Sequence, residues 1–187
     1  MICLKSDSGS AQKCADLLKK GKVLVLPTDT VYGFSGITDG TGNTDARIRQ
    51  IKGRAETKPF ICLIAHPEDI KQHTNDVIPQ KVLSLWPGAL TIIVNEKDGK
   101  STTAYRCPGD AWLRSVIEMC GSPVYSTSVN RSRSPVLDTV DEIKKEFETE
   151  VDLIVSDGDK KGSLPSTIVR VQNGQLTILR QGSVVID

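Results

Sequence analysis

A short polar stretch follows the apolar run at residues 23–26. Residues 27–33 read Pro-Thr-Asp-Thr-Val-Tyr-Gly, which places two hydroxyls, a carboxylate and a phenol directly after an expected buried strand. A turn alone does not need this many polar groups. The stretch is therefore a candidate wall of a pocket for a polar ligand.

A second stretch gathers positive charge. Residues 52–59 read Lys-Gly-Arg-Ala-Glu-Thr-Lys-Pro, and the glycine and proline indicate a loop between a helix and a strand. Lys52, Arg54 and Lys58 would repel one another in such a loop unless an anion joins them. The alternative is a solvated run of mixed charge on the surface.

Three further polar clusters end expected strands. They are Arg106-Cys107-Pro108, the stretch Ser-Thr-Ser-Val-Asn-Arg-Ser at residues 126–132, and Arg180-Gln181-Gly182. Each alone is compatible with a turn or a helix cap. Ligands of open α/β sheets bind beyond strand ends, so together the clusters predict one crevice. Arginine forks grip phosphate or carboxylate, which indicates an anionic small molecule and a second polar ligand.

The expected elements alternate along the chain. Apolar spacing predicts helices at residues 10–20, 45–52, 67–72, 80–86, 112–120 and 138–148. Short apolar runs predict strands at residues 23–26, 60–65, 90–94, 124–127, 153–155, 167–171 and 176–179, with Asn173-Gly174 as a hairpin turn. Helical crossovers imply parallel pairs and the hairpin implies an antiparallel one. We therefore expect one α/β domain with a mixed sheet flanked by helices.

Composition excludes several classes of protein. The chain has 187 residues and a net charge of +1, which argues against binding nucleic acid by bulk electrostatics. No apolar run reaches the roughly 20 residues that span a bilayer, and the N-terminus lacks the core of a signal peptide. The five cysteines are scattered, which indicates reduced thiols in a cytoplasmic protein. The chain has two histidines, His66 and His73, so a metal site or a catalytic triad is not expected. We expect each histidine to be a helix-capping or surface residue.

Seven motifs occur in an order that resembles the YrdC/TsaC family of L-threonylcarbamoyladenylate synthases. They are PTDTVYG, KGRAETKP, WPGALT, RCP, STSVN, PSTIV and LRQG, and they run from about Lys20 to Gly182. The resemblance implies a twisted α/β fold with a large, concave, basic cleft. It also implies the short form of the family, with residues 1–187 as a single YrdC-like domain and no room for a further C-terminal domain.

The family's reaction joins L-threonine, bicarbonate or CO2, and ATP into L-threonylcarbamoyladenylate and pyrophosphate. This is the first step in making N6-threonylcarbamoyladenosine (t6A) in tRNA. A downstream threonylcarbamoyl-transferase complex and tRNA would be the further partners, and Mg²⁺ would be carried by ATP and water, without protein ligands.

The resemblance also assigns roles to residues of this chain. Those expected to bind ATP are Lys52, Arg54, Lys58, Ser128, Asn130 and Arg180, of which Lys52, Arg54, Ser128 and Asn130 would also carry catalysis. Those expected to bind threonine are Thr30, Arg106 and Ser126, with Arg106 on the carboxylate and Tyr32 shaping the pocket.

The chain departs from the family pattern after Asn130. Many relatives have Ser-Gly-x-Pro there, whereas this chain reads Arg131-Ser132-Arg133-Ser134-Pro135, and Val129 replaces the usual alanine.

Two alternatives remain open at this point. A non-catalytic RNA-binding or ribosome-associated module would use the local cations Lys52, Arg54, Lys58, Arg131 and Arg133. A carbamoyl-transfer domain of a hydrogenase-maturation protein shares the fold, but the chain lacks that protein's zinc-finger cysteines.

Overall fold

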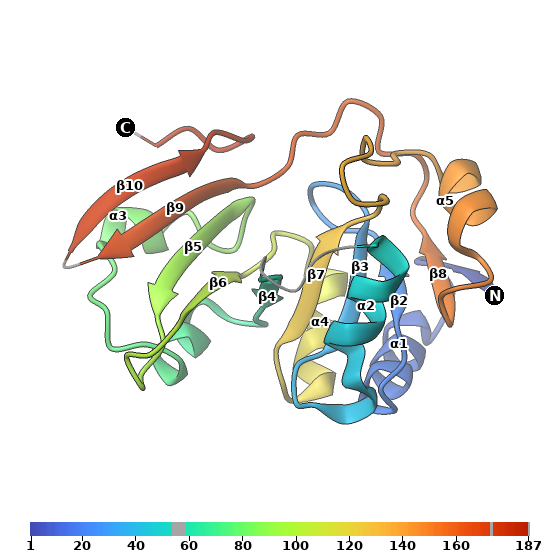
Figure 1. Ribbon diagram of the computed structural model, residues 1–187, viewed down its shortest axis with the longest axis horizontal. Coiled ribbons are helices and arrows are strands. Elements are labelled where there is room, and N and C mark those ends of the chain that lie inside the picture. The colour runs from blue at the N-terminus through green and yellow to red at the C-terminus, as the bar shows by residue number, and fades with distance from the viewer. Residues whose placement is uncertain (54–58, 173, 187) are drawn as a thin grey trace.

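Ten strands form one mixed sheet in the computed structural model, which describes residues 1–53, 59–172 and 174–186 (Figure 1). The order is β1-β8-β2-β3-β7-β4-β6-β5-β9-β10. In chain order the strands are β1 (Ile2–Leu4), β2 (Leu24–Leu26), β3 (Gly33–Ile37), β4 (Ile61–Leu63), β5 (Leu90–Asn95), β6 (Thr102–Arg106), β7 (Val124–Ser128), β8 (Leu153–Ser156), β9 (Thr167–Gln172) and β10 (Gln175–Arg180).

Helices cover both faces of the half of the sheet that contains β8, β2, β3 and β7. Helices α1 (Ser10–Lys19) and α4 (Ala111–Cys120) pack on one face, and α2 (Thr44–Lys52) and α5 (Val140–Phe147) pack on the other. Strand β2 shows why: Leu24 and Leu26 belong to the core with α1 and α4, whereas Val25 belongs to the core with α2 and α5. Successive strand residues point to opposite faces, so a continuous apolar run suits a strand buried on both sides.

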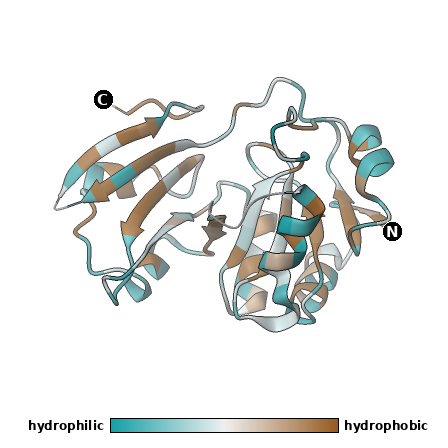
Figure 2. Ribbon diagram, viewed as in Figure 1, coloured by the Kyte–Doolittle hydropathy of each residue, from teal (hydrophilic) through white to brown (hydrophobic). Residues whose placement is uncertain are grey.

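Strands β4, β6, β5 and β9 share a further apolar core on one face of the sheet. That core includes Ile70 of the 3-10 helix η2 (Pro67–Gln72), Val82 of α3 (Gln80–Leu83), and Trp86. Figure 2 shows the apolar residues concentrated on the strands, with hydrophilic residues over much of α2 and α5. On the opposite face, Ile61 and Ile168 line a cavity, and Ile61 also packs against the core with α1 and α4.

The mixed sheet is confirmed. Strands β1 and β8 are parallel, and β9 and β10 are antiparallel with Gln172 opposite Gln175. Asn173 of the expected turn lies outside the described residues. The expected helix at 80–86 ends at Leu83, and residues 67–72 form a 3-10 helix.

Sequence patterning missed β1 and β3 entirely. Strand β3 reads Gly-Phe-Ser-Gly-Ile, in which two glycines and a serine weaken the strand signal. The position of Gly36 explains the composition: a Cβ there would lie 2.5 Å from Thr44 Cβ, so only glycine lets α2 pack this closely. The whole strand is nevertheless buried at the centre of the sheet.

Over the described part of the chain, none of the helices has the length and apolar character needed to cross a membrane.

Candidate functional site

One cavity of about 370 Å³ collects six of the residues that the sequence predicted for the site. They are Thr30, Tyr32, Arg106, Ser126, Ser128 and Arg180. The other lining residues that the structure describes add hydroxyls and apolar surface, and none of them is Asp, Glu or His. The cavity therefore offers two guanidinium groups and many hydroxyls, which suits an anionic, polar ligand.

The cavity lies over a face of the sheet, and the expectation of a crevice beyond strand ends was incomplete. Strands β2 and β7 end at one edge, whereas β6 and β10 run the other way and end at the opposite edge. Ser126 pairs with both Ser35 and Ile61, so it stands within the sheet. Side chains from both edges thus converge over the twisted sheet.

Arg106 is buried at the base of this cavity and held on three sides. Its Nη1 donates to Thr30 Oγ1 at 2.9 Å, Nε donates to Gly88 O at 3.2 Å, and Nη2 donates to Asp29 Oδ1. Burial lowers the pKa of the guanidinium and Asp29 opposes that shift, so the group keeps its charge. Of its five N–H donors, one on each terminal nitrogen remains for a ligand.

Asp29 is the main residue that sequence reasoning left unassigned. Its Oδ2 accepts from the backbone N–H of Gly109 at 2.7 Å while Oδ1 accepts from Arg106. The carboxylate is not among the residues lining the cavity, so it orients Arg106 from behind. The polarity of residues 27–33 was the available signal, but nothing in the sequence paired Asp29 with Arg106.

Arg180 is anchored by the start of β9. Its Nε and Nη2 donate to Ser166 O at 3.1 and 2.8 Å, and Nη2 also reaches Ser166 Oγ at 3.2 Å. Ser166 shares a 2.8 Å hydrogen bond with the buried hydroxyl of Thr91. Gly182 permits this arrangement, since a Cβ there would lie 2.2 Å from Pro165 O.

Tyr32 and Gly33 both line the cavity. The phenol donates to Gly158 O at 2.7 Å and accepts from Asp157 N at 2.8 Å, and burial raises its pKa, so it stays neutral. A Cβ on Gly33 would lie 2.7 Å from Ser126 Oγ. Glycine at this position therefore leaves room for the Ser126 hydroxyl in the cavity.

Lys52 ends the helix that was expected at residues 45–52, and the interpretation of a solvated charge run is wrong for it. It is the last residue of α2 and is buried. Its Nζ donates to Asn130 Oδ1 at 2.8 Å, to Asn130 O at 3.0 Å and to Ser128 O. Ser128 Oγ donates to the same Asn130 Oδ1 at 2.8 Å, so the three residues form one cluster. Ser128 lines the cavity, whereas Lys52 and Asn130 are not among its described lining residues. Arg54 and Lys58 lie outside the described residues.

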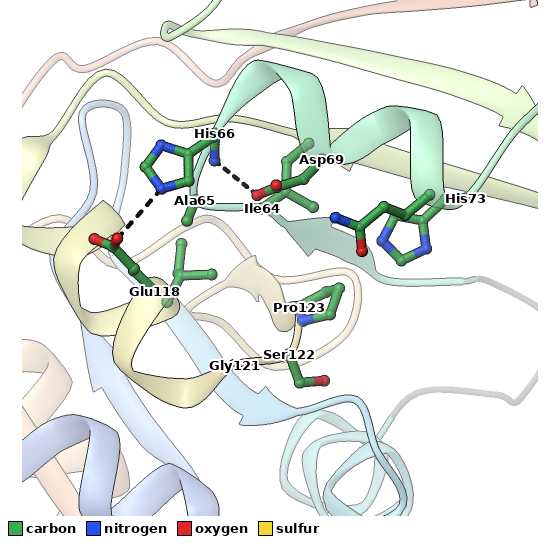
Figure 3. Close-up of a pocket in the computed structure, with 11 residues that line it drawn as sticks. Ile64, Ala65, His66, Asp69, His73, Glu118, Gly121, Ser122 and Pro123 are labelled. Carbon is green, nitrogen blue, oxygen red and sulfur yellow. Dashed lines mark hydrogen bonds and ion pairs between the residues drawn. The ribbon is translucent and has the colours of Figure 1, made fainter.

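A second cavity of about 270 Å³ holds both histidines and none of the predicted site residues (Figure 3). His66 precedes η2, where its backbone N–H donates to Asp69 Oδ2 at 2.9 Å, and its Nε2 lies 3.5 Å from Glu118 Oε1. This confirms His66 as a capping residue. Within the described ranges, His, Cys, Asp and Glu nowhere gather into a set of three that could hold a metal.

Two curated proteins are similar to this chain over most of its length. A putative threonylcarbamoyl-AMP synthase of Methanocaldococcus jannaschii is 31% identical over 94% of this chain and 89% of its own length. The threonylcarbamoyl-AMP synthase of Pyrococcus abyssi is 26% identical over 92% of this chain, which spans only 54% of that protein.

Solved structures share the fold. P. abyssi Sua5 complexed with L-threonine superposes with a TM-score of 0.83 at 25% identity, covering 94% of this chain and 55% of that one. Escherichia coli YciO, at 21% identity and a TM-score of 0.81, covers 98% of this chain and 94% of its own. The family model described as telomere recombination, Sua5/YciO/YrdC, matches residues 16–182. The chain belongs to the Sua5/YciO/YrdC family.

Proposed function

We propose that this protein is an L-threonylcarbamoyladenylate synthase. The observation that carries the proposal is the single cavity in which Arg106, bound to Thr30, faces the same space as Ser126, Ser128 and Arg180. A carboxylate ligand and a phosphate ligand can both be bound there. The relatives named threonylcarbamoyl-AMP synthase support this choice among anionic ligands.

Threonine is the ligand for the Arg106 side. The two N–H donors that Arg106 does not spend on protein acceptors match the two oxygens of an α-carboxylate. Thr30 and Ser126 place hydroxyls beside it. The complex of P. abyssi Sua5 with L-threonine is consistent with an amino-acid pocket in this fold.

ATP is the ligand for the side with Ser128, Asn130 and Arg180. Lys52 brings positive charge to the Ser128–Asn130 turn from beneath, and Arg54 and Lys58 follow it in sequence. Since the described lining residues include no carboxylate, Mg²⁺ arrives as part of the ATP substrate and is held by phosphate oxygens and water.

The chemistry needs positioning more than protein acid–base groups. The deprotonated amine of threonine attacks bicarbonate, water leaves and a carbamate forms. A carbamate oxygen then attacks the α-phosphorus of ATP, and pyrophosphate leaves. The cavity's contribution is to fix both substrates in line and to neutralise charge on the phosphates, which can supply much of the rate enhancement. Because a carbamate is labile in water, we expect the bound substrates to exclude water from it.

Substrate omission tests the proposal. Purified protein is incubated with ATP, Mg²⁺, threonine and bicarbonate, and pyrophosphate and the adenylate are both quantified. Release of pyrophosphate should require threonine and bicarbonate together, and serine should be poorer by roughly 10–200-fold because it lacks one methyl group. Equal pyrophosphate release without any amino acid would contradict the proposed reaction.

The adenylate would then pass to a threonylcarbamoyl transferase that acts on tRNA. We place the reaction in the cytoplasm, since all five cysteines are free thiols, as in most proteins of reducing compartments.

A further inference from the structure

Arg131 follows the Ser128–Asn130 turn and bridges two helices. Its Nε donates to Glu146 Oε1 at 2.8 Å, and Nη1 and Nη2 contact the two carboxylate oxygens of Glu150. Both glutamates belong to the α5 region, which includes the residues just after the helix. Nη1 also donates to the carbonyl of Ile51, one residue before Lys52 on α2. The side chain therefore ties the end of α2 to α5.

A row of rings connects Arg131 to Lys52 by a second route. The Arg131 guanidinium lies 4.6 Å from the ring centre of Phe147, and Phe147 meets Phe34 edge-on with ring centres 4.9 Å apart. The ammonium of Lys52 lies 5.4 Å from the centre of the Phe34 ring. Such cation–ring contacts fix direction as well as distance. The position of Lys52 is thus coupled to Arg131 through its backbone neighbour and through the rings.

The backbone at Arg131 contacts the same cluster. Arg131 O accepts from Asn130 Nδ2 at 3.0 Å and from Ser134 N at 3.0 Å. Ser132 N donates to Lys52 O at 2.7 Å. Asn130 Nδ2 also donates to Ser134 O at 2.8 Å, and these two acceptors orient the amide while its Oδ1 accepts from Lys52 and Ser128.

We propose that Arg131 is a positioning residue for ATP binding: it holds Lys52, Ser128 and Asn130 in the arrangement that receives the phosphates. This inference rests on the proposed function. Ser128 is the member of the cluster that lines the cavity, and Arg131, like Lys52 and Asn130, is not among the described lining residues, so Arg131 acts through the cluster. The glutamate pairs are partly exposed, with side-chain exposures of 38% for Arg131 and 45% for Glu146. Exposed pairs of this kind add little to stability, so the effect of Arg131 should appear mainly in binding.

Arginine is needed because the three partners lie in different directions. Lysine keeps the charge but has one nitrogen, which cannot reach Glu146, Glu150 and Ile51 O together. Arg131→Lys therefore separates geometry from charge. Arg47 on α2 offers a matched control, because it is similarly exposed, at 37%, and also joins a carboxylate, Asp152 at 3.1 Å, and a carbonyl, Gly21 O at 3.3 Å.

The test compares the wild type with Arg131→Lys, Arg131→Met and Arg47→Lys in steady-state adenylate synthesis and thermal unfolding. Both Arg131 variants should raise the KM for ATP by roughly tenfold or more, the scale of one lost hydrogen bond to a charged group. The KM for threonine should stay within about twofold, and the Tm of Arg131→Lys should match that of Arg47→Lys. An unchanged KM for ATP, or equal rises in both KM values, would overturn the inference.

A second measurement does not depend on activity. Amide hydrogen exchange of Ser132 and Ser134, whose N–H groups are bonded within the cluster, should accelerate in Arg131→Lys and not in Arg47→Lys. Unchanged exchange would refute the positioning role. If the wild type makes no adenylate while the exchange changes as expected, the proposed function fails, whereas the role of Arg131 in holding the Lys52–Ser128–Asn130 cluster stands.

Discussion

Replacing Arg106 by lysine tests the amino-acid pocket most directly. The native guanidinium makes three hydrogen bonds, to Gly88 O at 3.2 Å, to Thr30 Oγ1 at 2.9 Å and to Asp29. A lysine nitrogen can keep one of these directions, so about two hydrogen bonds to a charged group are lost, each contributing about 1.5–3 kcal/mol. Asp29 is 19% exposed and stays partly solvated. We therefore expect the loss to lie at the lower end of this range, so Arg106→Lys should lower the unfolding free energy by about 3 kcal/mol.

The same substitution should weaken the binding of threonine more than the binding of ATP. Lysine replaces a two-point grip on the carboxylate by one hydrogen bond, which corresponds to a rise of roughly 10–150-fold in the KM for threonine. The assay is threonine-dependent adenylate formation below the variant's Tm, with ATP varied separately. Arg114→Lys is the control, since Arg114 binds Pro108 O and Gly109 O at 2.9 and 3.0 Å nearby without lining the cavity. Threonine kinetics for Arg106→Lys equal to those of Arg114→Lys would refute the assignment.

Three further outcomes follow from single residues. Lys52→Met should abolish ATP binding. It should also lower the unfolding free energy by about 3 kcal/mol or more, because it leaves buried acceptors on Ser128 and Asn130 unpaired. Denaturant titration measures this loss of stability. Arg133→Gly should raise the unfolding free energy by up to about 1 kcal/mol, since Arg133 has a φ of 71°; a lower Tm would contradict this. Iodoacetamide at pH 8 should modify the half-buried Cys3 before Cys14, whose pKa burial raises to about 12, as peptide mass mapping would detect.

The sequence predicted several residues of the cavity but not the arrangement of strands that brings them together. Motifs that end strands identified Thr30, Arg106, Ser126 and Arg180 as one group, and the cavity unites them. The sequence did not reveal that β6 and β10 run in the opposite direction to β2 and β7, because strand direction depends on which strands pair. Pairing is a long-range property that local patterns do not encode.

Lys52 shows a related limit. The expected helix at residues 45–52 is confirmed, since α2 continues to Lys52 and Gly53 ends it in the left-handed conformation. A lysine at the end of a helix suits the negative end of the helix dipole, so its position is consistent with local rules. What the sequence could not show was burial: the acceptors that compensate it come from the Ser128–Asn130 turn. Substituting Lys52 therefore tests fold and function together.

Arg133 reconciles the departure from the family pattern with the observed loop. The resemblance described above implies Ser-Gly-x-Pro after STSVN, and matching its proline to Pro135 puts the expected glycine at Arg133. The φ of 71° at Arg133 lies in the region that favours glycine. The backbone path therefore suits the family's residue even though the side chain differs, and the hydrogen bonds of Asn130 Nδ2 to Arg131 O and Ser134 O hold it.

Contacts of the basic side chains within the protein bear on the alternative hypothesis of an RNA-binding module. That hypothesis relied on five cations: Lys52, Arg54, Lys58, Arg131 and Arg133. The structure describes Lys52, Arg131 and Arg133. Lys52 is buried against carbonyl oxygens, and Arg131 pairs with two glutamates.

Binding to RNA phosphates gains free energy by releasing counterions from the nucleic acid, and each contributing cation must face the phosphate. Lys52 and Arg131 would have to break their internal contacts to do so, whereas Arg106 and Arg180 already face a cavity sized for a small molecule. The distribution of charge therefore favours an enzyme that binds anionic substrates over a module that binds RNA. A tRNA affinity that falls steeply between two salt concentrations, together with no adenylate formation, would reverse this conclusion.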